Sequence, residues 1–104
     1  MSYELLKLAI RQKQQVTAHY QGKRREFCPH ALGKKDGIEH CMAYQFGGES
    51  SKPLKPIGSG GNWRCFIVSA LTNVMLRDGQ WHTSPKHDGP HQDCIVDLDI
   101  EASR

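Results

Sequence analysis

The sequence lacks a long hydrophobic run and the loop motifs of common enzymes. Its apolar segments are far shorter than the roughly 20 residues that cross a bilayer, so we predict no association with a membrane. It contains no glycine-rich phosphate loop, no nucleophile elbow and no paired carboxylates in a shared apolar segment. We therefore predict a protein that is not an enzyme and needs no cofactor.

Close cysteine pairs are absent from the sequence. The four cysteines stand at positions 28, 41, 65 and 94, and none belongs to a Cys-x-x-Cys motif. In apolar or alternating segments, a free cysteine behaves as a small buried hydrophobe. The N-terminal segment carries its basic residues after its apolar part, unlike a signal peptide. We expect a cytoplasmic protein without disulfides.

Metal and thiol chemistry each have one weak candidate. His87, His91 and Cys94 have acceptable local spacing for zinc, but no second close pair completes the four ligands that zinc requires. We therefore expect a polar loop over residues 82–94 and no metal. Cys28 is the cysteine with basic neighbours that would favour a thiolate, although its position in an expected strand favours packing.

Positive charge is concentrated in the first half of the chain. The 104 residues are 38% hydrophobic and 24% charged, as in an ordinary single globular domain, with a net charge of +3. Residues 1–55 contain ten lysines and arginines against five acids, and residues 56–104 contain four against six. This asymmetry favours an anionic partner for the first half. The alternative is a solvated basic face followed by an acidic tail.

The hydrophobic pattern predicts one helix followed by five or six short strands. Residues 3–14 space Leu5, Leu6, Ala9 and Ile10 along one helical face. From residue 16 the period changes to two, which indicates strands. The expected strands are 16–20, 24–29, 38–46, 63–68, 73–77 and 94–100, with long loops at 47–62 and 79–93. We predict a mainly β, Sm/SH3-like bent barrel over residues 15–100, in one domain spanning 1–104. Segment 63–68 is apolar on both faces, which suggests a central strand.

Basic and aromatic residues fall on strands that we expect to be neighbours. Small barrels bind single-stranded nucleic acid by combining a basic groove with aromatic stacking platforms. The candidate binding residues are Tyr20, Arg24, Arg25, His40, Tyr44, Trp63 and Arg64. The alternative is that Tyr44 and Trp63 form a half-buried cross-strand pair and that the arginines protect sheet edges.

The first 80 residues or so resemble a WYL domain, an Sm-like barrel common in bacterial regulators. "LLKLAIRQKQQV" and "VTAHY" are similar to the family's opening helix and its strand ending in tyrosine. "RREFCPHAL" resembles its arginine, hydrophobe, proline and leucine pattern, and "WRCFIVSALTNVML" its closing strand and turn. At the signature itself the chain reads "GIEHCMAY", which keeps only the alanine–tyrosine pair.

The resemblance implies a free-standing sensor module that binds nucleic acid or a small anionic ligand in transcription regulation. Carried over to this sequence, the sensing face would include Tyr20, Arg25, His40 and Arg64. His40 stands where the family has tyrosine and would make that face sensitive to pH. The alternative function is an accessory domain that interacts with proteins through the barrel edge, as a homodimer or with a partner regulator.

Overall fold

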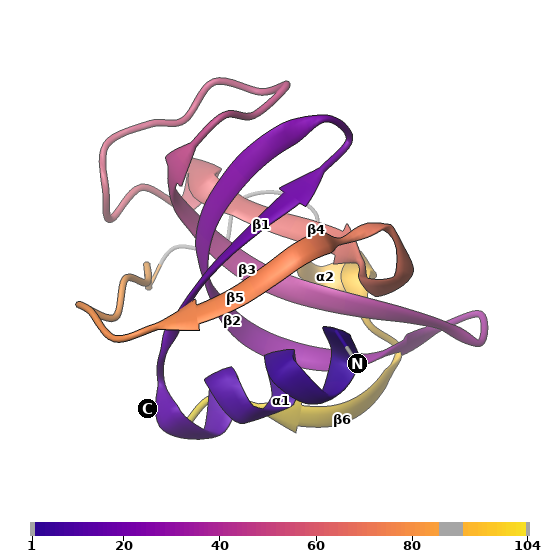
Figure 1. Ribbon diagram of the computed structural model, residues 1–104. Coiled ribbons are helices and arrows are strands. Elements are labelled where there is room, and N and C mark those ends of the chain that lie inside the picture. Colours follow the sequence, from indigo (N-terminus) through magenta and orange to yellow (C-terminus); the bar gives the residue numbers. More distant parts are fainter. Residues whose placement is uncertain (1, 86–90, 104) are drawn as a thin grey trace.

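One helix and six antiparallel strands form most of the computed structural model, which describes residues 2–85 and 91–103 (Figure 1). The first elements are α1 (Ser2–Gln12), β1 (Gln15–Tyr20), β2 (Lys23–Lys35) and β3 (Ile38–Gly48). They are followed by β4 (Trp63–Ile67), β5 (Thr72–Arg77), a one-turn helix α2 (His91–Cys94) and β6 (Asp97–Glu101). Single 3₁₀ turns lie at Gly60–Asn62 and Val68–Ala70.

The strands form one sheet in the order β4-β3-β2-β1-β5, with β6 also paired to β2. The long strand β2 makes this possible because β1 pairs with its first part and β6 with its last part. Irregularities in the register interrupt the pairing of β2 with β3 and of β1 with β5, and such bulges bend a sheet. The predicted mainly β, barrel-like fold with an N-terminal helix is confirmed.

The core lies between α1 and the concave side of the sheet. Leu6, Ala9 and Ile10 of α1 are buried, whereas Leu5, which we placed on the same face, is 39% exposed. In the strands, alternate residues reach the core, and Val16 of β1 lies opposite Phe27 of β2. Within residues 2–85 and 91–103, no helix is long and apolar enough to span a membrane.

Strand β4 lies at the end of the sheet, so the prediction that residues 63–68 form a central strand is wrong. Across the described ranges, β4 pairs with β3 alone. Its two apolar faces have separate causes. Phe66 packs into the core against Phe27, while Trp63 is buried on the opposite face against Tyr44 and His30.

Cys65 and Cys94 form a disulfide, which corrects the expectation of a chain without disulfides. The two Cα atoms are 5.6 Å apart although 29 positions separate the residues in sequence. They meet because α2, which ends at Cys94, packs against β3 and β4, a contact between distant segments that local spacing does not reveal (Figure 1). Cys28 and Cys41 are free and buried, as expected.

Gly33 allows β6 to approach β2 closely. A Cβ atom at this position would collide with the Asp97 carbonyl and the Ile95 side chain. We expect Gly33→Ala to lower the free energy of unfolding by about 1–3 kcal/mol, the usual cost of overpacking. Urea denaturation followed by circular dichroism measures this change. Lys34→Ala, at the exposed neighbouring position, is the control and should change stability by no more than about 0.5 kcal/mol.

Candidate anion-binding site

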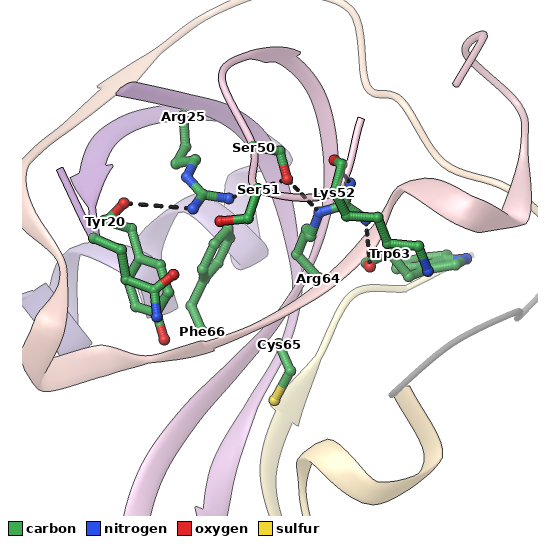
Figure 2. Close-up of a pocket in the computed structure, with 10 residues that line it drawn as sticks. Tyr20, Arg25, Ser50, Ser51, Lys52, Trp63, Arg64, Cys65 and Phe66 are labelled. Carbon is green, nitrogen blue, oxygen red and sulfur yellow. Dashed lines mark hydrogen bonds between the residues drawn. The ribbon is translucent and has the colours of Figure 1, made fainter. Parts of the chain in front are cut away.

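Four of the seven candidate residues line one cavity at the open end of the bent sheet (Figure 2). This cavity, the arginine pocket, has a volume of about 260 Å³. Its lining consists of Tyr20, Gln21, Arg25, Ser50, Ser51, Lys52, Trp63, Arg64, Cys65 and Phe66. These residues come from the β1–β2 hairpin, the loop after β3, and β4.

The β1–β2 hairpin turns Arg25 into the pocket. Gln21 and Gly22 both have positive φ angles, of 54° and 74°, as a two-residue type I′ turn requires. This turn places Ala18 opposite Arg25, so that the arginine shares the core-facing side of the hairpin. Arg25 is only 3% exposed. The sequence therefore directs a charged side chain to the rim of the hydrophobic core.

The buried Arg25 guanidinium is poorly satisfied. Its Nη1 donates to Gln45 Oε1 at 3.2 Å and to Ser50 Oγ at 3.5 Å, and its Nη2 donates to the Tyr20 carbonyl at 3.4 Å. All three are longer than typical N–H···O bonds of about 2.9–3.0 Å. Its Nε is buried and has no hydrogen-bond partner among the residues that the structure describes. Loss of water around the group lowers the pKa of Arg25 from its ordinary value.

Aromatic rings form the floor beneath Arg25. Its guanidinium carbon lies 5.5 Å from the centre of the Tyr20 ring and 5.7 Å from that of Phe66. The two rings pack edge to face, with centroids 4.8 Å apart. These cation–π contacts partly compensate the lost hydration, but they supply no negative charge.

Arg64 approaches the same point from β4. Its Nε donates to Ser50 Oγ at 3.2 Å, while its Nη1 and Nη2 donate to the carbonyls of Gly61 and Lys52 at 2.8 and 3.0 Å. Burial lowers the pKa of Arg64, and the positive charge of Arg25 lowers it further. In residues 2–85 and 91–103, neither arginine forms an ion pair with a carboxylate.

The Ser50 hydroxyl joins the two arginines (Figure 2). Its oxygen accepts hydrogen bonds from Arg25 and from Arg64, and no residue of the described segments accepts its proton. Lys52 adds a third cation at the exposed rim. The pocket thus presents two guanidinium groups, a hydroxyl donor and an ammonium group to one small volume.

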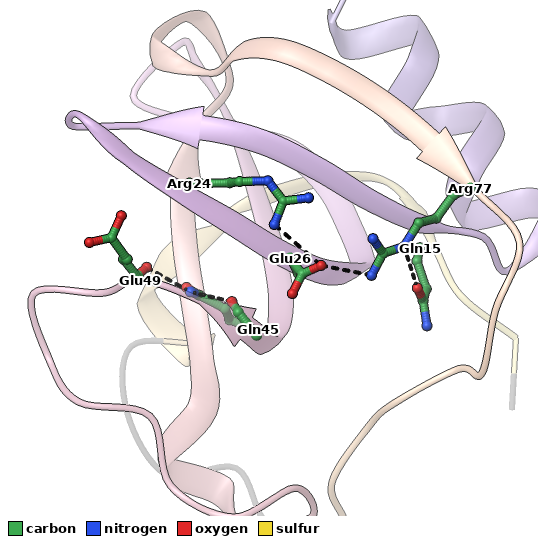
Figure 3. Close-up of polar contacts among 7 residues, drawn as sticks. Gln15, Arg24, Glu26, Gln45, Glu49 and Arg77 are labelled. Atoms are coloured by element: carbon green, nitrogen blue, oxygen red, sulfur yellow. Dashed lines mark hydrogen bonds and ion pairs between the residues drawn. The ribbon is translucent and has the colours of Figure 1, made fainter.

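Arg24 does not belong to the pocket. It pairs with His19 across the hairpin and therefore points to the opposite side of β2 from Arg25. There it lies 3.4 Å from the Glu26 carboxylate, which also binds Arg77 at 2.9 Å (Figure 3). Arg24 therefore shares a carboxylate with Arg77 on the outer surface. Because β2 pairs with both β1 and β3, Arg24 does not protect a sheet edge.

His40 and Tyr44 also lie away from the pocket. His40 is near the start of β3, opposite Ile67, and its Nδ1 lies 2.8 Å from the Ile38 carbonyl. Tyr44 is fully buried and packs edge to face on Trp63, its cross-strand partner, at 5.1 Å. Its hydroxyl donates to the Ser59 carbonyl at 2.7 Å. Tyr44 therefore fits the packing alternative.

The loop after β3 contributes residues to the pocket that were not predicted from the sequence. Ser50 and Lys52 enter the pocket from it, and Gln45 supports Arg25 from the core-facing side of β3. One signal was present in the sequence: Gln45 shares a strand face with Cys41 and Ala43, both of which are buried. A polar side chain on a buried face requires a hydrogen-bonding partner, and here that partner is Arg25.

The zinc alternative finds no support in the part of the chain that the structure describes, where no cluster of three or more His, Cys, Asp or Glu residues could hold a metal ion. Cys94 is bonded to Cys65 and cannot act as a thiolate ligand. His87 and the side chain of His91 lie outside what the structure describes.

Cys28 has the environment of a packing residue. It is fully buried, and this burial raises the pKa of its thiol to about 11. We expect iodoacetamide to leave Cys28 unmodified in the native protein at pH 8, because the thiolate fraction is small and the sulfur is inaccessible. Mass spectrometry after alkylation, with a denatured sample as control, measures this. Rapid native alkylation at Cys28 would contradict it.

Comparison with protein-family models, with curated proteins and with solved structures finds no match to this chain. The resemblance to WYL domains therefore stays a prediction from the sequence.

Proposed function

We propose that the protein is a non-enzymatic, WYL-like binding module that holds a phosphate group in the arginine pocket. The phosphate would belong to a nucleic acid or to a small anionic ligand, and the module would serve transcription regulation. The observation that carries the proposal is the pair Arg25 and Arg64, two guanidinium groups that converge without a carboxylate partner among the described residues.

The burial of the Arg25 charge is the main energetic reason to expect an anion in the pocket. Removing a cation from water costs several kcal/mol unless an opposite charge and good hydrogen bonds compensate it. The hydrogen bonds of Arg25 are long, and within the described segments its buried Nε has no partner. An anion next to Ser50 would compensate both arginines and would accept the hydroxyl proton. Guanidinium groups suit phosphate because several N–H donors face several oxygens.

Titration calorimetry with inorganic phosphate and with short single-stranded RNA and DNA oligonucleotides tests this function. We expect Arg64→Ala to weaken binding by about 10- to 100-fold, the effect of removing a hydrogen bond to a charged group. Arg24→Ala is the matched control, because it removes the same charge from the opposite side of the same sheet region. Equal losses in the two variants, or no loss in either, would contradict the proposal.

The same titrations distinguish the two sources of phosphate. A nucleic-acid ligand should bind more tightly than inorganic phosphate, and its affinity should fall linearly with salt on logarithmic axes. If the natural ligand is a small anion, the protein should bind the oligonucleotides no more tightly than inorganic phosphate.

The proposed location is the cytoplasm, where a transcriptional module meets its ligand. Cytosolic disulfides are rare because cellular reductants keep thiols reduced. The redox state of Cys65 and Cys94, trapped by acid quenching and alkylation in cells, therefore tests the location. A fully oxidised pair would argue for an oxidising compartment.

A further inference from the structure

A second cavity lies on the other face of β4, outside the arginine pocket. Alternation along the strand turns Arg64 toward the barrel interior and Trp63 outward. The returning C-terminal segment encloses the outward face, leaving a cavity of about 710 Å³ that we name the aromatic cavity. Its lining consists of Lys13, His30, Met42, Trp63, Trp81, Thr83, Ser84, Pro85, Glu101, Ala102 and Ser103.

Flat rings dominate one wall of this cavity. The Trp81 ring stacks on His30, with centroids 4.7 Å apart and planes 31° apart. His30 in turn meets the edge of Trp63 at 4.8 Å, and Met42 borders the same volume. Trp81 remains partly exposed. The rings of the wall already contact one another, so they offer an incoming ring a surface that is assembled in advance.

His30 and Thr83 place one hydrogen-bond acceptor in the wall. His30 Nδ1 lies 2.8 Å from the Cys28 carbonyl, which only accepts, so Nδ1 carries a proton. In the neutral ring, Nε2 is then an acceptor, and the Thr83 hydroxyl 3.0 Å away must donate to it. The Thr83 oxygen keeps its lone pairs and can accept a hydrogen bond from a ligand.

The described lining of the aromatic cavity contains one residue of each charge. Lys13 and Glu101 both border it, and neither forms an ion pair in residues 2–85 and 91–103. The described lining of the arginine pocket, in contrast, contains three cations and no acid. A free phosphate group would find no paired guanidinium groups here, so the cavity favours a ligand without net charge.

We propose that the aromatic cavity binds a small, uncharged, planar heteroaromatic molecule that carries a ring N–H or an amino group. The ring would pack against Trp81 and Met42, and its N–H would donate to Thr83 Oγ1. The volume falls within the range typical of small-molecule pockets, which combine apolar walls with a few placed polar groups. The proposal is independent of the function proposed for the arginine pocket.

Amide-detected NMR titration with benzimidazole and with adenine tests the inference. We expect saturable shifts at the Trp81 indole N–H, at Thr83 and at Ala102. Trp81→Ala should weaken binding by about tenfold or more, in line with the loss of ring stacking. Thr83→Val should weaken it about three- to tenfold, because it removes the acceptor and keeps the shape.

Two controls keep the test decisive. Arg64→Ala should leave the affinity for both probes unchanged, and inorganic phosphate should not displace them. Trp81→Phe retains a ring and should bind more tightly than Trp81→Ala, and the spectra show directly whether each variant is folded. The proposal is overturned if neither probe gives saturable shifts at the aromatic cavity. It is equally overturned if Trp81→Ala binds like the parent, or if Arg64→Ala abolishes binding.

Discussion

Replacement of Arg25 by methionine is expected to stabilise the ligand-free protein by about 1–2 kcal/mol while weakening phosphate binding at least tenfold. Replacement of a buried ion pair or triad by apolar residues of similar volume is often neutral or stabilising by about 1–4 kcal/mol, because the cost of removing the charges from water is recovered. The loss of the partner of Gln45 Oε1 opposes this gain and costs about 1–3 kcal/mol. We expect the first effect to dominate, because Arg25 has long hydrogen bonds, a bare Nε and no carboxylate partner in the described ranges.

Urea denaturation in a phosphate-free buffer measures this change, and the titrations with phosphate measure the loss of binding. Arg24→Met is the control, because its side chain is exposed and should change the free energy of unfolding by no more than about 0.5 kcal/mol. A lower free energy of unfolding for Arg25→Met would show that the arginine serves to hold the pocket together. The burial of the Arg25 charge would then not be unfavourable, and it would no longer support an anion at this site.

Removal of the Cys65–Cys94 disulfide is expected to lower the free energy of unfolding by roughly 3–4 kcal/mol. The bond closes a loop over a sequence separation of 29 residues, and loss of chain entropy in the unfolded state gives about this amount for such a length. The double variant Cys65→Ala/Cys94→Ala tests the value in parallel with the parent, with and without a dithiol reductant.

The reductant itself provides the control. It should destabilise the parent and leave the double variant unchanged, because the remaining cysteines, Cys28 and Cys41, are free thiols in both. Coincident unfolding curves for the oxidised and reduced parent would contradict the prediction.

The fold could be predicted from the sequence where one face of a segment is buried and the other is exposed to solvent. Val16, Ala18 and Tyr20 alternate with polar residues, and this period of two identifies β1 and its inward face. The same alternation separates Arg25 from Arg24 once the turn at residues 21 and 22 sets the register. The sequence-based prediction placed both arginines on one surface, because the alternation of the strand was not continued across the turn.

Other features depend on contacts between distant segments, which local patterns do not encode. Trp63 and Phe66 are both apolar, but the first is covered by the returning C-terminal segment and the second by the core. An edge strand that is covered on both faces therefore shows the same apolar sequence pattern as a central strand. The disulfide and the entry of Ser50 into the arginine pocket likewise depend on how long loops close, and loop residues carry little periodic signal.

The positions of the four cysteines favour folding of the chain before oxidation of its thiols. Before folding, all four thiols are accessible, and oxidation can join any two of them. In the folded chain Cys28 and Cys41 are buried, whereas Cys65 and Cys94 are brought together. Correct pairing is therefore favoured when collapse precedes oxidation, and a strong oxidant applied to the denatured chain should trap mispaired species.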